Sequence, residues 1–221
     1  MTRPLSNSAQ STNGDACSLT DQPLSAKHIA ILDAATKMFL EQGYSPTSMD
    51  AIARAAGVSK QTIYNQFADK STLFGAVIKA LCNDITRQAA PVDLDSSDVQ
   101  AGLTALADWI VTAIISPTSV ALYRVIISEG PNIPELGEVS YRAGTEKFLN
   151  TVAEYLRRRT ACGDMKVEHP LLVAEQFLGM LSGRIQMRML VGIGGPPDSG
   201  HLELIIDHAV DAMIKTYGSA E

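Results

Sequence analysis

The chain has 221 residues, 46% of them hydrophobic and 19% charged, and carries a formal net charge of −6. It is long enough for a substantial core in two lobes, and no apolar run approaches the ~18 residues of a membrane span. Because the N-terminus also lacks the apolar stretch of a signal peptide, we expect a soluble, cytoplasmic protein.

Residues 1–25 are rich in Ser, Thr, Asn, Gln and Pro and contain almost no large apolar side chains. Such a segment cannot bury enough surface to order itself, so we expect a disordered arm. Arg3 could reach a DNA minor groove, as the arms of some helical DNA-binding domains do, although Asp15 and Asp21 offset its charge. Contact between the arm and DNA stays an open alternative.

The first predicted helix spans residues 26–42, with an apolar stripe that includes Ile31 and Phe39, and Gly43 ends it. The stretch 47–70 then predicts two short helices joined by a tight turn. Thr47 and Ser48 are good N-cap residues for a helix that Gly57 ends. Ser59 caps the next helix, whose inner anchors are Ile63 and Phe67 at i, i+4.

The outer face of this second short helix carries only hydrogen-bonding groups and one cation. Amides suit adenine, hydroxyls suit any base, and Lys suits guanine or phosphate. A polar helix face is often merely solvated, but the order of caps, glycine and apolar anchors favours a DNA-binding helix-turn-helix.

The residue order I-A-x-x-A-G-V-S-x-x-x-I-Y-x-x-F-x-x-K from Ile52 to Lys70, after a helix ending in Gly43-Tyr44, carries a family resemblance. It resembles the DNA-binding domain of tetracycline-repressor-type (TetR/AcrR) regulators over roughly residues 28–75. Gln61 stands where the family commonly has Gly, and Asn65 and Gln66 stand where aromatic residues or His are usual. Individual base contacts are therefore not carried over from the family.

We expect Gln61, Tyr64 and Asn65 to face the groove. Thr47, Ser59 and Lys70 are expected to hold phosphates. The full set of expected DNA-binding residues is Thr47, Ser48, Ser59, Lys60, Gln61, Thr62, Tyr64, Asn65 and Lys70. Residues 26–70 hold five basic and four acidic side chains, so the acidity lies elsewhere and keeps non-specific DNA affinity low.

The remaining chain predicts further helices and no strand, giving an all-α protein of about nine helices. A helix from Asp69 to about Ala90 would act as a lever that starts at the DNA and ends in a second domain. The other predicted helices span about 98–115, 119–129, 134 or 138 to 159, 170–192 and 201–217. The expected domains are the arm (1–25), the helix-turn-helix domain (26–70) and a ligand-binding and dimerisation domain (71–221).

The helix at 170–192 is apolar on two sides, and Gly179, Ser182 and Gly183 form a small-residue patch on it. With the last helix it predicts a four-helix interface in a homodimer. The alternative is that both helices are core of a monomer. The family resemblance implies the dimer, and a two-fold dimer implies a palindromic operator.

Apolar stripes from several helices of the second domain predict either a tight core or a ligand cavity. Methionines adapt to irregular shapes, and Arg184 interrupts an apolar stripe, where it needs Glu129 or an anionic ligand group as partner. The expected ligand-binding residues are Leu106, Ile110, Tyr123, Ile127, Tyr141, Phe148, Phe177, Met180, Arg184 and Met187. The resemblance implies a small apolar or amphipathic effector.

The cysteines, the histidines and the short motifs of the chain do not indicate an enzyme. The three cysteines are an odd number at long spacings, which favours reduced thiols over disulfides or zinc, with a redox switch as the alternative: Cys17, Cys82 and Cys162. The histidines form no catalytic motif, and no phosphate-binding or nucleophile motif is present. A surface metal site at His201 and His208 is the alternative to a solvated helix face. We expect no enzyme activity, cofactor or metal.

The sequence thus predicts a homodimeric transcriptional regulator, most simply a repressor that a small ligand releases from a palindromic double-stranded DNA operator. The alternative is a DNA-binding or protein-interaction module without a small-molecule response.

Overall fold

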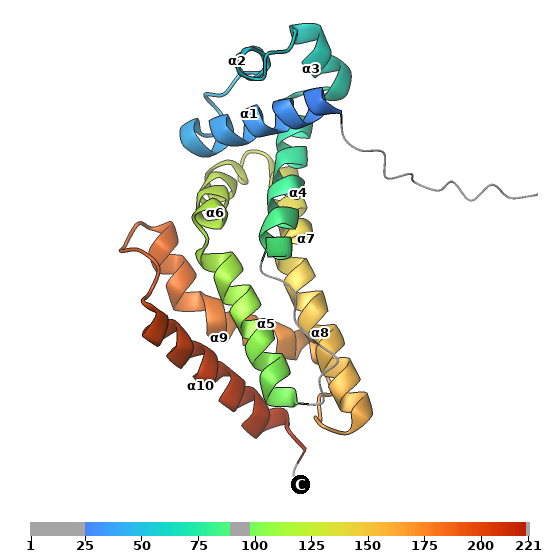
Figure 1. The fold of residues 1–221 in the computed structure, drawn as a ribbon, viewed down its shortest axis with the longest axis vertical. Coiled ribbons are helices and arrows are strands. Elements are labelled where there is room, and N and C mark those ends of the chain that lie inside the picture. Colours follow the sequence, from blue (N-terminus) through green and yellow to red (C-terminus); the bar gives the residue numbers. More distant parts are fainter. Residues whose placement is uncertain (1–24, 89–97, 220–221) are drawn as a thin grey trace, which may run out of the picture.

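The computed structural model describes residues 25–88 and 98–219, and the expected arm lies outside them. Within these residues the chain forms ten α-helices, and the extended pairing is limited to an isolated bridge between Met165 and Gly218. The all-α prediction is confirmed (Figure 1). The helices are α1 (Ala26–Gln42), α2 (Met49–Ala55), α3 (Lys60–Gln66), α4 (Lys70–Gln88), α5 (Val99–Ile115), α6 (Pro117–Glu129), α7 (Pro134–Ala143), α8 (Thr145–Cys162), α9 (Pro170–Leu190) and α10 (Ser199–Tyr217).

The helix expected from residue 134 or 138 to 159 is two helices, which accounts for ten in place of about nine. The chain breaks at Gly144, whose φ of −113° and ψ of −85° are not helical. A Cβ there would lie 3.2 Å from the carbonyl oxygen of Ser140 and 3.5 Å from Sγ of Cys82. The break lets α7 pack against α4 while α8 packs against α9.

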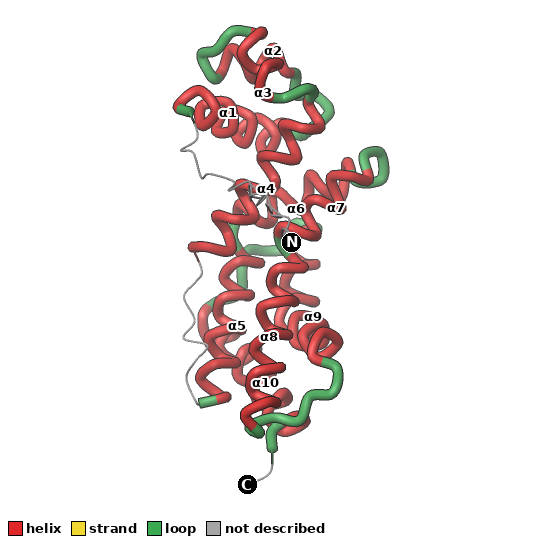
Figure 2. Tube along the Cα trace, turned by 90° about the vertical axis from the view of Figure 1, so that its right-hand side faces the viewer, coloured by secondary structure: helices red, strands yellow, loops and turns green. Residues whose placement is uncertain are grey.

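The molecule is elongated, and its helices form two groups along the long axis. The N-terminal head (α1–α3) lies at one end, the C-terminal bundle (α5, α8, α9, α10) lies at the other, and α4, α6 and α7 lie between them (Figures 1 and 2). Among the described residues, none of the helices is by itself long and apolar enough to cross a membrane. The α5–α6 pair, bent by 62°, meets that test only by combined length and composition.

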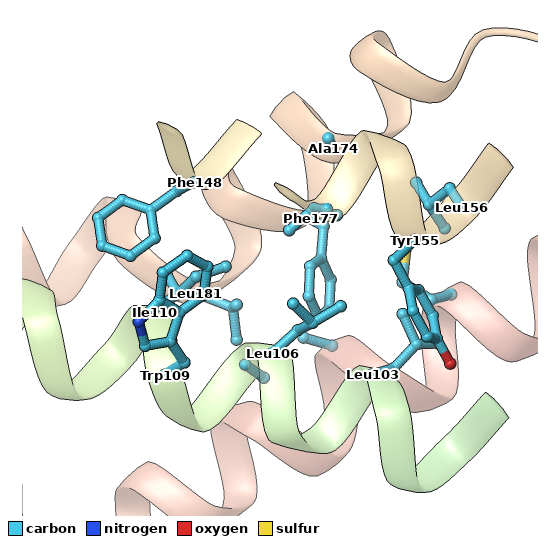
Figure 3. Packing of buried hydrophobic residues seen from close by; sticks show 14 of the residues in the cluster. Leu103, Leu106, Trp109, Ile110, Phe148, Tyr155, Leu156, Ala174, Phe177 and Leu181 are labelled. Carbon is cyan, nitrogen blue, oxygen red and sulfur yellow. The ribbon is translucent and has the colours of Figure 1, made fainter. Parts of the chain in front are cut away.

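Two hydrophobic clusters correspond to these groups. In the bundle, Trp109 and Phe148 lie with ring centroids 4.5 Å apart, and Phe177 and Tyr155 are fully buried beside them (Figure 3). The cluster of the head unites α1–α4 and also includes residues of α6 and α7: Leu122, Val125 and Leu136. The head therefore shares its core with two helices of the second predicted domain.

Candidate DNA-binding surface and internal cavity

Helices α2 and α3 are held at a sharp turn by local capping. The Ser48 hydroxyl accepts a hydrogen bond from the Ala51 N–H (3.2 Å), and the Ser59 hydroxyl accepts one from the Thr62 N–H (3.1 Å). Gly57 between them has φ +66°, a left-handed conformation that costs a non-glycine residue about 1–2 kcal/mol. Both caps and the turn glycine thus stand where the sequence predicted them.

Helix α3 buries Ile63 completely and keeps its polar face in solvent. Gln61 Nε2 donates to Asn65 Oδ1 at 2.8 Å, so the two amides form a pair along this face. Tyr64 is 41% exposed beside them. The pair leaves donor and acceptor positions free for a base edge, which matches the groove-facing role predicted for these residues.

Lys60 is tied to the neighbouring helix. Its ammonium lies 2.9 Å from the Asp50 carboxylate of α2, and this hydrogen bond and charge raise the pKa of Lys60 above its ordinary value. Thr62 is partly buried and its hydroxyl lies 2.8 Å from that of Ser59. Among the expected contacts on α3, Gln61 and Asn65 therefore bond only to each other and remain accessible to a partner.

The phosphate contacts expected of Thr47 and Lys70 do not match the structure. Thr47 is only 2% exposed, and its hydroxyl donates to the Gly43 carbonyl at 2.8 Å. The Lys70 ammonium donates to the carbonyls of Tyr44, Ser45 and Thr47 and lies 4.2 Å from the Tyr44 ring centroid. Both side chains fix the turn between α1 and α2, because three carbonyls at its tip need a donor.

A partly enclosed cavity of about 80 Å³ lies among the helices α4–α9. Its wall is mostly apolar with several small hydroxyl groups. The lining residues are Cys82, Ile85, Thr86, Ala113, Ile114, Ser119, Leu122, Tyr123, Ser140, Gly144, Thr145, Phe148, Leu178, Ser182 and Gln186. Burial raises the pKa of the Cys82 thiol to about 11.

The structure brings only two of the ten expected ligand residues to this cavity, Tyr123 and Phe148. Three others are fully buried core: Leu106, Ile110 and Phe177. Four others are largely exposed because the stripes that hold them face outward: Ile127, Tyr141, Met180 and Met187.

The expected environment of Arg184 is wrong. It is exposed and lines an open groove with Arg188 and His201 between α9 and α10, so it needs no buried partner. Glu129, its suggested partner, instead accepts hydrogen bonds from the Ser45 hydroxyl at 3.0 and 3.1 Å. The side of α9 that carries Arg184, Met180 and Met187 is exposed and does not line the cavity.

Sequence reasoning missed Ser119, Ser140 and Gln186 on the wall. A small polar residue inside an apolar stripe gives no periodic signal, so only the packed structure identifies them. Several large apolar residues of α9 and α10 are exposed: Leu171, Leu172, Met180, Met187 and Leu204. Leu171, Met180 and Met187 belong to the predicted stripes of α9, whereas Ile206, Ala209 and Met213, predicted for the interface on α10, are buried in the core of the subunit. Exposed apolar side chains of this size favour an interaction site.

A capped helix-turn-helix with an exposed polar helix, joined by α4 to a helical body with an internal cavity, defines a DNA-binding transcriptional regulator. The sequence comparisons agree with this class. The model of bacterial regulatory proteins of the tetR family matches residues 31–77, and that of the AefR-like transcriptional repressor C-terminal domain matches residues 101–219. The chain belongs to the tetR family, whose members are regulators, not enzymes.

Similar proteins cover most of the chain. The transcriptional regulator SrpR of Pseudomonas putida is 26% identical over 159 residues, which are 69% of this chain and 70% of SrpR. A solved TetR-family regulator from Mesorhizobium loti is 31% identical, with a TM-score of 0.80 over 87% of this chain and 97% of its own. The solved flavonoid-responsive regulator FrrA is also 31% identical, with a TM-score of 0.78 over 88% and 98% of the two chains.

Proposed function

We propose that the protein is a homodimeric repressor that binds a palindromic operator and leaves it when a small apolar or amphipathic effector enters the cavity. In this proposal residues 26–70 bind DNA and residues 71–221 bind the effector and dimerise. The similarity to a repressor C-terminal domain and to a regulator named as flavonoid-responsive supports both the repressor role and a small-molecule signal.

The observation that carries the proposal is the position of α6 between the cavity and the head. Leu122 lines the cavity and also belongs to the hydrophobic cluster of the head. Two turns later, Glu129 accepts the hydrogen bonds of Ser45 at the start of the α1–α2 turn. A displacement of α6 at the cavity is therefore passed directly to the turn that precedes α2.

The size of the cavity gives a reason for such a displacement. At about 80 Å³ it is smaller than the roughly 150 Å³ engineered apolar cavity that accepts benzene. An effector with even one ring must push the surrounding helices apart. It releases DNA if it binds the displaced arrangement more tightly than the DNA-competent one, since a ligand shifts an equilibrium only by its differential affinity.

The dimer rests on the uncovered apolar face of α9 and α10. A two-fold axis through this face pairs the two helices with their copies in a four-helix interface and presents two heads to one face of DNA. Each half-site would then be contacted by Gln61, Tyr64 and Asn65, with Ser48, Ser59 and Lys60 near the phosphates.

The test begins with selection of bound duplexes from a random DNA pool by the full chain. We expect a palindrome whose half-site centres lie one helical turn or a multiple apart. The anisotropy of a labelled operator is then followed during titration with apolar compounds, and at least one compound should release it. A monomer that selects an asymmetric site would contradict the dimer, and an operator that no compound releases would favour a regulator without a small-molecule response.

The role of α6 is tested by Ser45→Ala and Glu129→Ala. Each removes the same contact from opposite sides, so each should raise the effector concentration needed for release by a similar factor while operator affinity stays nearly constant. The double variant should add little, because both partners act as one unit. Glu135→Gln removes a carboxylate from the start of α7 and is the matched control; equal effects of the control would contradict the coupling role.

A further inference from the structure

The wall of the cavity contains hydrogen-bonding groups but none of the charged side-chain types. Its polar residues are three serines, two threonines, one tyrosine, one glutamine and one cysteine. One cation contacts a residue of the wall from behind: the Lys147 ammonium donates a hydrogen bond to the Thr86 hydroxyl at 2.8 Å. A carboxylate in this cavity would lose its hydration and find no cation on the wall itself. The charge of Lys147 acts on the wall from behind and is already bonded to Thr86, so it compensates that loss only in part.

Two hydroxyls of the cavity wall, those of Ser119 and Ser140, make no hydrogen bond within the described residues. Ser119 on α6 is 4% exposed and Ser140 on α7 is 6% exposed. Across residues 25–88 and 98–219, neither side-chain oxygen makes a hydrogen bond, and both residues border the cavity. Neither oxygen is among the fully buried polar atoms that lack a partner, so each keeps a little open surface. Because both residues are otherwise buried and line the cavity, these two hydroxyls are available to a ligand there.

The other hydroxyls of the wall are already occupied. Ser182 donates to the Leu178 carbonyl at 2.7 Å, and the hydroxyls of Tyr123 and Thr145 lie 3.0 Å apart. Thr86 donates to the Asn83 carbonyl while it accepts from Lys147. The two unpaired hydroxyls, on α6 and α7, are thus the hydroxyl anchors that buried residues of the wall offer, and Gln186, the remaining polar side chain there, is only partly buried.

We propose that the effector is an uncharged molecule with an apolar body and hydroxyl or carbonyl groups, which Ser119 and Ser140 bind by hydrogen bonds. This inference rests on the proposed function and narrows it to a chemical class. An effector that pairs with Arg184 would need an anionic end. The effector proposed here has a neutral polar end instead. It also places one anchor on α6, the helix that reaches the head.

Matched pairs of probes that differ in charge but little in shape test this class. The first pair is 4-hydroxyacetophenone and 4-hydroxybenzoate, and the second is 1-octanol and octanoate, all titrated into the full-length protein by calorimetry at pH 6.5. In at least one pair, the uncharged member should bind at least about tenfold more tightly than its carboxylate, because the wall offers no counter-charge. The same member should release the selected operator at lower concentration.

Serine variants locate the anchors. Ser119→Ala and Ser140→Ala should each weaken the uncharged probe by about three- to tenfold, the usual loss for one neutral hydrogen bond. Ser182→Ala is the control, since that hydroxyl lines the same cavity but already donates to a carbonyl, and it should change the affinity by less than about twofold. Thermal unfolding of each variant shows whether it keeps its fold.

Three results would overturn the inference. In the first, the carboxylates bind as tightly as their uncharged partners, and Lys147→Met abolishes that binding. This result would show that Lys147 pairs with the ligand and that the effector is an anion, while the proposed function would stand. Equal losses in all three serine variants would show that the anchors are not Ser119 and Ser140. Failure of every probe to bind or to release the operator would count against the cavity as an effector site, and the inference would fall with it.

Discussion

The N-terminal head and the cavity differ in how their functional residues are spread along the chain. The head presents its polar residues on α3, a single helix of seven residues that Ser59 caps, and Ser48 caps the preceding α2. The cavity takes its wall from the six helices α4–α9, most of which contribute only one to three residues. One site is local in sequence, and the other exists only after packing.

This difference decides what each region tolerates. In the proposed function, a change on the exposed face of α3 should alter DNA recognition without disturbing a core. A change on the cavity wall should alter packing, effector binding and the position of α6 together. Variants that separate these effects are therefore the most informative. The largest effect is expected from a substitution on the apolar face of α9 and α10.

Gly183→Leu should have the largest effect. Among the described residues, a Cβ at Gly183 meets nothing within 4 Å beyond its chain neighbours and the backbone of its own helix, so this part of the subunit has room for the larger side chain. If α9 packs against its copy, the introduced leucine side chain separates the helices, gives monomers, and lowers operator affinity by about 10³-fold towards the non-specific level. Sedimentation and operator titration measure both.

Gly137→Leu provides the control, because Gly137 on α7 also has no atom within 4 Å of an added Cβ. Its dimer should persist. A Gly183→Leu protein that remains a dimer with normal operator affinity would remove the α9–α10 face from the interface.

Gln61→Ala tests the local site. Loss of the amide paired with Asn65 should cost about 1–3 kcal/mol on the preferred operator and relax the preference at one base position. Lys60→Ala should weaken binding to all sequences by a similar factor if its ammonium lies near the phosphates, as we propose. Binding to a set of single-base operator variants distinguishes the two, and an unchanged base preference in Gln61→Ala would assign readout to other residues.

Lys70→Met tests whether the stability of the head depends on the hydrogen bonds that Lys70 makes to the turn between α1 and α2. Three carbonyls lose their charged donor, so the free energy of unfolding should fall by about 1–3 kcal/mol. The salt dependence of operator binding should stay the same because no phosphate contact is lost. Stability that is unchanged, together with a salt slope lowered by about 1, would instead make Lys70 a phosphate ligand.

Much of the fold was predictable because caps, glycines and apolar stripes act over a few residues. The start of α2 at Ser48, the turn at Gly57 and the end of α1 at Gly43 all follow from such signals. The break at Gly144 was not predictable, since the helical stripe continues across it and the break becomes visible only when α7 packs on α4 and α8 packs on α9.

The two candidate sites also differ in how far the sequence predicts them. Gln61, Tyr64 and Asn65 are exposed as expected because the helical period and two inner anchors determine the outer face of α3. The cavity wall was largely missed, because a stripe such as Leu106 and Ile110 looks the same whether it faces a core or a cavity. Arg184 was misassigned for a related reason, since a second apolar side on α9 can face a partner subunit as well as an interior.

The smallest expected effect concerns Cys82, which tests how enclosed the cavity wall is. Burial raises the pKa of its thiol to about 11 from an ordinary value of 9.0, so the folded chain holds the proton more tightly than the unfolded chain does. The stabilisation this gives is complete below pH 9 and is lost as pH rises through 11. The unfolding free energy of the wild type, relative to that of Cys82→Ala, should therefore fall by about 1 kcal/mol or less between pH 8 and pH 9.5. Cys162→Ala, which removes an exposed thiol in place of the buried one, is the control. A difference that stays constant from pH 8 to pH 11 would mean that water reaches Cys82 freely and that the cavity is an open cleft, in which a carboxylate would keep its hydration.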